Sequence, residues 1–345
     1  MKMTMRWFGE TDRVKLEDIR QIPGLTGIVS AIYDIPAGEV WPKEKIRKLK
    51  NKIESYGMTL DVIESVPVHE DIKLGRSTRD YYIANYQQTL RYLADEGVGT
   101  VCYNFMPVFD WTRSKLDYKY KDGSTALIYE NEVILETDPL SGSLELPGWD
   151  LSYGNQELKT LIDDYQSITE EDMWENLRYF LNAIMPVAEE VKMKMAIHPD
   201  DPPWSIFGLP RIITSEKNLE RVLRMYDHPL NGLTLCSGSL GADKNNNIPQ
   251  MVRRFGKEGR IHFAHVRNVK RTGERSFYET SHLSSDGSLD IADIMKAYAE
   301  IKFDGPLRPD HGRMIWGEKG RPGYGLYDRS LGASYLNGLY EAFTY

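Results

Sequence analysis

Eight short apolar runs, separated by longer amphipathic segments, are the feature that most constrains the fold of this chain. The runs are rich in β-branched and aromatic residues, as buried strands are, and they lie at residues 5–8, 27–32, 60–66, 99–106, 193–199, 232–237, 260–266 and 305–310. The segments between them have helical periodicity; one example places Ile46, Leu49 and Ile53 on one face and ends at Gly57. Eight strands that alternate with helices over 345 residues predict a single (β/α)8 barrel, or TIM barrel.

An open, doubly wound sheet is the alternative arrangement of the same elements. It has no support in the sequence, because no G-x-G-x-x-G motif follows an early strand. Residues 110–167 add no further βα unit and contain turn and hairpin patterns, such as the one at Asp122–Gly123. A loop of this length predicts a lid-like insertion after strand four, within one domain that spans residues 1–345; a plain surface excursion is the other interpretation.

Composition excludes several classes of protein. The net charge is −8 with no basic stripe, which argues against a nucleic-acid partner, and no apolar run approaches the roughly 18 residues of a membrane helix. The amino terminus lacks the apolar core of a signal peptide, and Cys102 and Cys236, the two cysteines, make no disulfide framework. We therefore expect a cytoplasmic protein. An acidic surface with a long insertion is compatible with a homodimer, and the sequence indicates no more than that.

Four residues that could bind a metal stand at the carboxyl ends of the last four predicted strands. They are His198, Cys236, His265 and Asp310, at intervals of 38, 29 and 45 residues. Each interval corresponds to one βα unit, so a barrel makes these strand ends neighbours on the rim that carries active sites. Imidazole, thiolate and carboxylate groups that meet there predict a divalent-metal site.

Each of these residues has a plainer explanation when it is taken alone. A lone buried cysteine packs as a small hydrophobe, a strand-end histidine is commonly just hydrogen-bonded, and Asp310 could cap a turn before His311. The coincidence of four suitable residue types at four consecutive strand ends is what favours the metal.

Strand parity separates the two histidines of the seventh strand. Side chains alternate faces along a strand, so His262 and His265 point in opposite directions. With His265 in the barrel, Phe263 and Arg267 also face inward, and His262 packs against the helices as a structural residue. The remaining histidines are expected in loops or at helix ends, outside the site: His69, His228 and His282.

Around these residues the sequence resembles the mannonate dehydratases, enzymes of hexuronate (glucuronate) catabolism that remove water from D-mannonate. The matching motifs are H-P-D-D-P-P at 198–203, C-S-G-S at 236–239, F-A-H-V-R-N at 263–268, P-D-H-G at 309–312 and G-Y-G-L-Y-D-R at 323–329. The resemblance extends from M-R-W-F-G near the start of the chain to its last helical segment, and these motifs in this order are very specific.

The resemblance implies a xylose-isomerase-like TIM barrel, dependence on Mn²⁺ or Fe²⁺, and 2-dehydro-3-deoxy-D-gluconate as the product. It implies the four strand-end residues as metal ligands, with His311 and Tyr324 near the reacting carbons. Donor chemistry alone does not select the metal, because two nitrogens, a sulfur and an oxygen suit Zn²⁺ at least as well.

The dehydration that the resemblance implies indicates roles for His311 and Tyr324. Dehydration of a 2,3-dihydroxy acid requires loss of the weakly acidic C2 proton and expulsion of hydroxide from C3, so a base and an acid must stand near a cation that stabilises the developing charge. His311 directly follows a predicted ligand and is the expected base. Pro309 and Gly312 let the chain leave the strand, so that Asp310 and His311 can face one site. Tyr324, in a loop rich in glycine and proline, is expected to protonate the leaving oxygen.

Substrate contacts are predicted from position. Arg267 lies two residues past His265 on the same face and could hold the substrate carboxylate through two hydrogen bonds, or form a salt bridge across the rim. Asn104, at the end of strand four, and Arg313, just after His311, are weaker candidates. The pair Asp200–Asp201 either orients His198 or solvates its loop.

Two other functions fit parts of the pattern. Sugar isomerases and epimerases of the same barrel type usually bind their metal with several carboxylates, whereas this chain offers a cysteine and two histidines. A non-catalytic, metal-containing protein that binds sugar acids would have no use for His311 and Tyr324. We therefore expect a hydro-lyase whose partner is a small anionic sugar acid.

Overall fold

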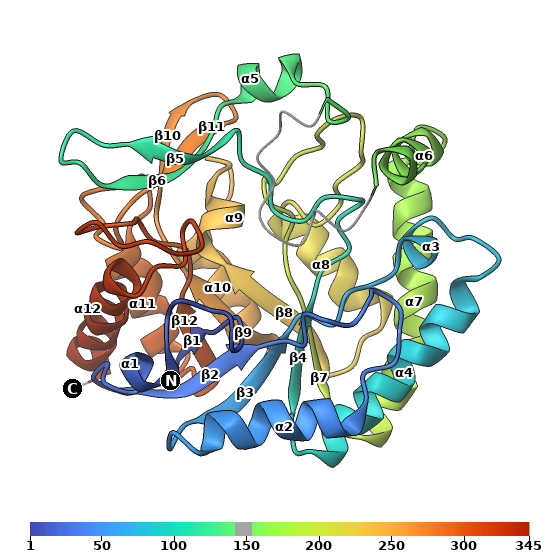
Figure 1. Cartoon of the computed structure of the whole chain (residues 1–345), viewed down its shortest axis with the longest axis horizontal. Helices are drawn as coiled ribbons and strands as arrows, with labels where there is room; N and C mark the ends of the chain where they lie inside the picture. The colour runs from blue at the N-terminus through green and yellow to red at the C-terminus, as the bar shows by residue number, and fades with distance from the viewer. Residues whose placement is uncertain (142–153, 345) are drawn as a thin grey trace.

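A closed barrel of eight parallel strands forms the centre of the molecule (Figure 1). The structure is a computed structural model that describes residues 1–141 and 154–344. In spatial order the strands are β1 (Lys2–Arg6), β12 (Pro306–Pro309), β9 (Ile261–Val266), β8 (Asn231–Cys236), β7 (Lys194–Ile197), β4 (Thr100–Tyr103), β3 (Thr59–Glu64) and β2 (Leu25–Ser30). Parallel pairing of Lys2 with Pro306 and of Met3 with Leu307 closes the barrel, which confirms the predicted fold class.

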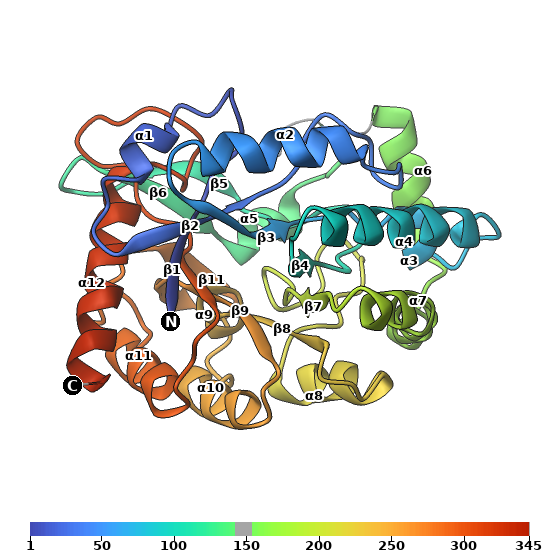
Figure 2. The same cartoon turned by 90° about the horizontal axis from the view of Figure 1, so that it is seen from below.

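The helices surround the strands in both views (Figures 1 and 2). The longer ones are α2 (Lys43–Glu54), α4 (Arg79–Asp95), α7 (Glu170–Glu190), α8 (Glu216–Met225), α10 (Ile248–Lys257), α11 (Ile291–Glu300) and α12 (Tyr327–Thr344). Further helices stand in the connections: α1 (Leu16–Ile19), α3 (Glu70–Lys73), α5 (Asn131–Glu136), α6 (Asn155–Tyr165) and α9 (Ser237–Gly241). Within the described residues, no helix combines the length and the apolar character needed to cross a membrane.

Side chains fill the barrel from inside and outside. A small interior cluster consists of Val29, Val62, Cys102, Ala196 and Phe263, all buried. Phe263 therefore faces inward, as strand parity predicts. His262, its neighbour, packs outward next to Gly232 and is 4% exposed; burial lowers its pKa to about 4, so it is a neutral structural residue.

A second, antiparallel sheet lies over one end of the barrel (Figure 1). Its β5 (Lys115–Lys119) and β6 (Thr125–Tyr129) form the hairpin predicted at Asp122–Gly123, where Gly123 has a φ of +88°. The other half, β10 (Val269–Gly273) and β11 (Ser276–Glu279), comes from the connection after β9, and β11 pairs with β6. We did not predict this second half.

The predicted insertion after strand four is only partly described. Residues 142–153 of the range 110–167 lie outside the described residues, and the rest contains β5, β6, α5 and α6. The expectation that this segment holds only turns and hairpins is therefore wrong: two short helices accompany the hairpin.

Candidate metal centre and active site

Four adjacent barrel strands bring the predicted ligands to one rim. Cys236 ends β8 and pairs in register with His265 of β9, while His198 directly follows β7 and Asp310 directly follows β12. The sheet order β7-β8-β9-β12 makes these strand ends neighbours, as the intervals in the sequence predict.

Three of the predicted ligands form a compact group in which Cys236 and His265 are buried and His198 is partly exposed. One ligand atom each from His198, Cys236 and His265 lie within 4.8 Å of one another, an arrangement that could hold a metal ion. His198 Nε2 is 3.1 Å from His265 Nδ1. Asp310 is not part of this three-residue group, but its Oδ2 lies 3.6 Å from Cys236 Sγ and 3.9 Å from His265 Nδ1. Ligand bonds of about 2.0–2.3 Å in a tetrahedron put donor atoms about 3.3–3.8 Å apart. The separation of 3.6 Å lies in this range, and those of 3.1 and 3.9 Å lie just outside it, so small shifts of the side chains would admit a cation.

Hydrogen-bond partners orient both imidazoles toward this point. The Nδ1–H of His198 donates to the carbonyl oxygen of Pro199 at 2.6 Å, which leaves a lone pair on Nε2. The Nε2 of His265 lies 3.6 Å from a carboxylate oxygen of Glu64, which favours a proton on Nε2 and a lone pair on Nδ1. Arg308 and Arg6 outweigh the effect of burial and hold the pKa of Glu64 well below its usual range, so that carboxylate is charged. The lone pairs of His198 Nε2 and His265 Nδ1 and the sulfur of Cys236 therefore point toward one place, where a cation could bind all three.

The Cys236 sulfur accepts two hydrogen bonds from Ser239. The backbone N–H of Ser239 donates to Sγ at 3.4 Å and the Ser239 hydroxyl donates at 3.1 Å. The predicted role of Asp200–Asp201 in orienting His198 is not seen among the described residues. Asp200 instead accepts from the backbone N–H of Ile213, and the contact that fixes the His198 ring comes from Pro199.

His311 and Tyr324 form a hydrogen-bonded pair beside the metal group. The Tyr324 hydroxyl lies 2.9 Å from His311 Nε2, and the Nδ1 of His311 lies 3.2 Å from Glu279 Oε1. Burial raises the pKa of Glu279, but Arg267 and Arg113 outweigh it and bring that pKa down to about 2. Glu279 is therefore an acceptor, so Nδ1 carries the proton and Nε2 accepts the Tyr324 O–H.

Tyr324 keeps its proton at neutral pH. Burial, followed by the charge of Asp310, raises the pKa of the phenol above its ordinary value. Phe8 and Trp111 pack against it, with ring centroids 4.7 and 6.3 Å from the Tyr324 ring. The pair therefore places a protonated phenol and an imidazole side by side.

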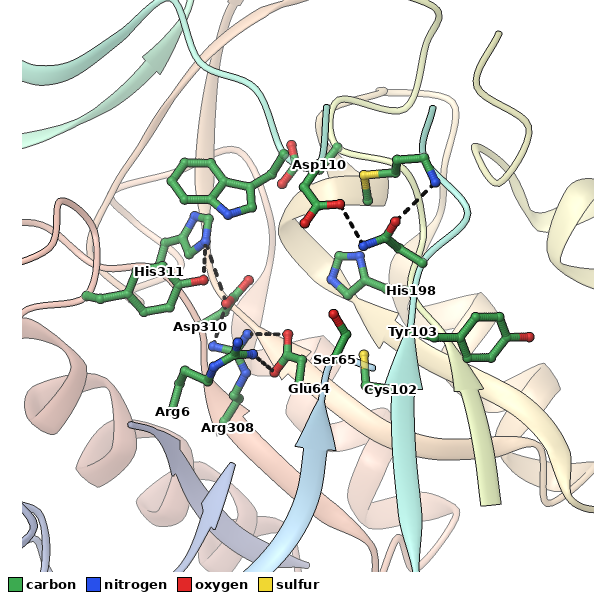
Figure 3. Close-up of a pocket in the computed structure, with 15 residues that line it drawn as sticks. Arg6, Glu64, Ser65, Cys102, Tyr103, Asp110, His198, Arg308, Asp310 and His311 are labelled. Carbon is green, nitrogen blue, oxygen red and sulfur yellow. Dashed lines mark hydrogen bonds and ion pairs between the residues drawn. The ribbon is translucent and has the colours of Figure 1, made fainter. Parts of the chain in front are cut away.

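A cavity of about 50 Å³ joins these groups (Figure 3). In Figure 3, His311 and Asp310 lie on one side of the cavity and His198 lies across from them. Arg6 and Arg308 line it as well, both buried; Arg308 Nη1 lies 2.7 Å from Asp310 Oδ1. Burial raises the pKa of Asp310, but the charge of Arg308 outweighs it, with smaller contributions from other neighbouring cations, and holds that pKa well below its usual range.

The three predicted substrate contacts have different outcomes in the structure. Asn104 lines the cavity, where its amide donates to Asp110 Oδ1 at 2.9 Å. Arg267 does not line the cavity. Its buried guanidinium binds Asp310, Glu279 and Asp201 at 2.9, 2.5 and 2.5 Å, which is the salt-bridge alternative. Arg313 does not line it either, because its guanidinium pairs with Asp328 at 3.2 Å.

Sequence reasoning missed several residues of this site. Arg308 stands two positions before Asp310, so strand parity could have found it, and Arg6 and Glu64 are the charged last residues of β1 and β3. Glu279 had no such signal, because only the unpredicted sheet brings it to His311.

Comparison with known proteins supports one family. The family model described as D-mannonate dehydratase (UxuA) matches residues 1–345. This chain belongs to the D-mannonate dehydratase family.

Relatives in the D-mannonate dehydratase family match nearly the whole chain. A protein from Halalkalibacterium halodurans named "Mannonate dehydratase 2" is 69% identical over 342 residues, 99% of each chain. A mannonate dehydratase from Streptococcus uberis is 57% identical over 99% of this chain and 98% of its own length. The crystal structure of mannonate dehydratase from Streptococcus suis serotype 2 has a TM-score of 0.93 and 49% identity, covering 99% of this chain and 95% of that one.

Epimerases of the same barrel type share the fold with the dehydratase family. A D-psicose 3-epimerase from Clostridium cellulolyticum H10 has a TM-score of 0.56 at 15% identity, covering 99% of this chain and 96% of that one. At that identity the likeness concerns only the barrel fold.

Proposed function

We propose that the chain removes water from D-mannonate to give 2-dehydro-3-deoxy-D-gluconate, in the catabolism of hexuronates. The observation that carries the proposal is the His311–Tyr324 pair, hydrogen-bonded at 2.9 Å, in the same cavity as His198 of the metal group. Membership of the D-mannonate dehydratase family supports it. The free, buried cysteines suit a cytoplasmic enzyme, and a homodimer remains part of the proposal.

In this proposal His198, Cys236, His265 and Asp310 hold a divalent cation. The converging lone pairs and the separations between donor atoms support this set. Mn²⁺ or Fe²⁺ follows from the family resemblance, and the donor set also suits Zn²⁺. Such a cation supplies Lewis-acid stabilisation of the charge that develops when a proton leaves the carbon beside a carboxylate.

His311 and Tyr324 move the protons. The Nε2 of His311 takes the C2 proton while Glu279 holds the opposite side of the ring and stabilises the imidazolium. The C3–oxygen bond then breaks, and Tyr324 gives its proton to the leaving hydroxide, which departs as water. His311 returns its proton to the phenolate across their 2.9 Å contact, so both residues recover their starting states. The enol that remains becomes the 2-oxo acid by tautomerisation.

Arg308 and Arg6 are our candidates to hold the substrate carboxylate. Both line the cavity. Arg267, the residue predicted for this role, does not line it, because its guanidinium forms ion pairs with three internal carboxylates. In the structure Arg308 and Arg6 also bind Glu64, at 3.0 and 2.8 Å, so they stay fixed before substrate arrives. Asn104 remains a candidate for a sugar hydroxyl.

An assay of the purified, metal-loaded protein with D-mannonate tests the function. We expect one equivalent of 2-oxo acid for each mannonate consumed, and loss of the activity on chelation with recovery when Mn²⁺ is added. Conversion of mannonate to a second sugar acid of unchanged mass would indicate an epimerase instead. Binding of D-mannonate without turnover, under all metals tried, would indicate a non-catalytic binding protein.

A further inference from the structure

A second hollow, of about 570 Å³, lies immediately outside the catalytic cavity. We call it the outer cleft; Phe8, Arg13, Trp111, Lys319 and Arg321 are among the residues that line it. Trp111 lines both the outer cleft and the catalytic cavity, and its ring lies 4.6 Å from that of His311. One aromatic side chain therefore stands between the two spaces.

The outer cleft is positively charged although the whole protein has a net charge of −8. It contains the side chains of Arg13, Lys319 and Arg321, and within the described part of the chain neither Arg13 nor Lys319 has an ion-pair partner. The carboxylate of Asp12, which also lines the cleft, accepts from the backbone N–H groups of Phe8 and Val14, at 2.9 and 3.1 Å. The cleft thus offers cations that an anion could neutralise.

The loop that carries these cations also carries Tyr324. Lys319 and Arg321 precede Tyr324 by five and three residues, and the Tyr324 N–H donates to the Arg321 carbonyl at 3.0 Å. The Arg321 guanidinium lies 4.2 Å from the centre of the Phe8 ring, which itself packs on Tyr324. Figure 2 shows this connection, between β12 and α12, beside α1 and the β5–β6 hairpin, and Met314 bridges to Thr125 of β6. An anion in the cleft would contact the segment that positions the proposed acid.

The volumes of the two spaces indicate that the substrate occupies the outer cleft before it enters the catalytic cavity. The catalytic cavity, at about 50 Å³, is far below the roughly 300–1,000 Å³ typical of ligand pockets, whereas the outer cleft falls inside that range. A six-carbon acid therefore has room in the cleft first and enters the cavity only when Trp111 or its neighbours move.

We infer that the outer cleft is a binding site for the carboxylate of the sugar acid, in which Arg13 and Lys319 capture the substrate before it passes Trp111. This inference rests on the proposed function, since it takes the substrate to be a sugar acid. The cleft raises the local concentration of the anion and thereby the rate of capture, without a part in the chemical step.

Kinetics of the metal-loaded double variant Arg13→Gln/Lys319→Gln test the inference, with Lys296→Gln, on the exposed face of α11, as a control of equal residue type. At low ionic strength we expect kcat/KM for D-mannonate to fall about tenfold in the double variant, with kcat unchanged. Near 1 M salt the Debye length is about 3 Å, so the difference from the parent should disappear. The control should behave as the parent at every salt concentration.

An unchanged kcat/KM at low salt would overturn the inference, and so would a loss that persists in 1 M salt, since that would be a structural defect. A readout independent of turnover separates this result from a failure of the proposed function. In calorimetric titration at low salt with D-gluconate, the C2 epimer of mannonate, the parent should bind at least fivefold more tightly than the double variant. Equal affinities would contradict the outer site whether or not the protein dehydrates mannonate.

Discussion

At the scale of single residues, the two cysteines are equally buried but have different partners. Cys102 lies in the barrel interior, where the Thr234 hydroxyl donates to its sulfur at 3.2 Å. Cys236 faces His265 and Asp310 and accepts two hydrogen bonds from Ser239. Burial raises the pKa of the Cys102 thiol well above its ordinary value, so that residue stays a neutral packing group. Only Cys236 stands where a thiolate could serve as a ligand.

Replacing Cys236 with serine should therefore lower metal content and activity together, because a hydroxyl is a much poorer ligand for these cations than a thiolate. The matched variant Cys102→Ser, also buried, should keep its metal. Elemental analysis of both purified variants is the measurement. A full complement of metal in the Cys236→Ser protein would remove this residue from the set of ligands.

Parity arguments explain which residues of the site could be predicted. His265 and Asp310 were found because each stands at a strand end of known direction, and His262 was correctly placed outside. Arg267 faces inward as predicted. Its partners Asp201 and Glu279 come from distant segments, and alternation along one strand contains no information about them.

At the scale of elements, the antiparallel sheet β10-β11-β6-β5 contributes residues to the active site at the end of the barrel. Glu279, the last residue of β11, binds His311 together with Arg113 and Arg267. Arg113 lies just before β5, so the two excursions that build the sheet meet in this ion network. The eight barrel strands were predictable because most are rich in buried apolar residues, whereas β10 is mostly polar and becomes a strand only through its partner.

The ion network makes stability depend on pH. Because the pKa of Glu279 is about 2 in the folded chain and about 4.3 unfolded, its contribution is present above pH 4.3 and is lost as the pH falls toward 2. From pH 5 to pH 3 this group alone should cost about 2 kcal/mol of unfolding free energy. Urea titrations of the parent and of Glu279→Gln should show a smaller loss in the variant. Equal losses would mean that Glu279 does not titrate as described.

The insertion after strand four should respond to the substrate. We propose that residues 110–167 act as a lid, because Trp111 at their start packs on His311 and Tyr324. A limiting amount of trypsin should cut the exposed turn at Lys121 in the free protein and cut it more slowly with D-mannonate. Cleavage at one rate in both conditions would argue for a plain surface excursion.

At the scale of the whole molecule, the proposed ligands and the proposed catalytic residues lie at one rim of the barrel. Strand ends supply the predicted ligands, the added sheet supplies Glu279, and the loop before α12 supplies Tyr324. The barrel, and the meeting of the four proposed ligands at one rim, followed from periodicity and spacing in the sequence. The second sheet and the ion network did not, since they depend on contacts between segments such as Arg113 and Glu279, 166 residues apart.

In the proposed mechanism His311 removes the C2 proton of D-mannonate, and proton NMR of the His311→Asn variant in deuterated solvent tests this role. The variant should retain its metal and bind D-mannonate, because His311 is not a proposed ligand. It should lose dehydration by about 10²–10⁴-fold, the usual worth of a general base, and the C2 hydrogen of the remaining mannonate should stay unexchanged. Dehydration, or exchange of the C2 hydrogen, at the rate of the parent would contradict the account and make Tyr324 the first candidate for the base.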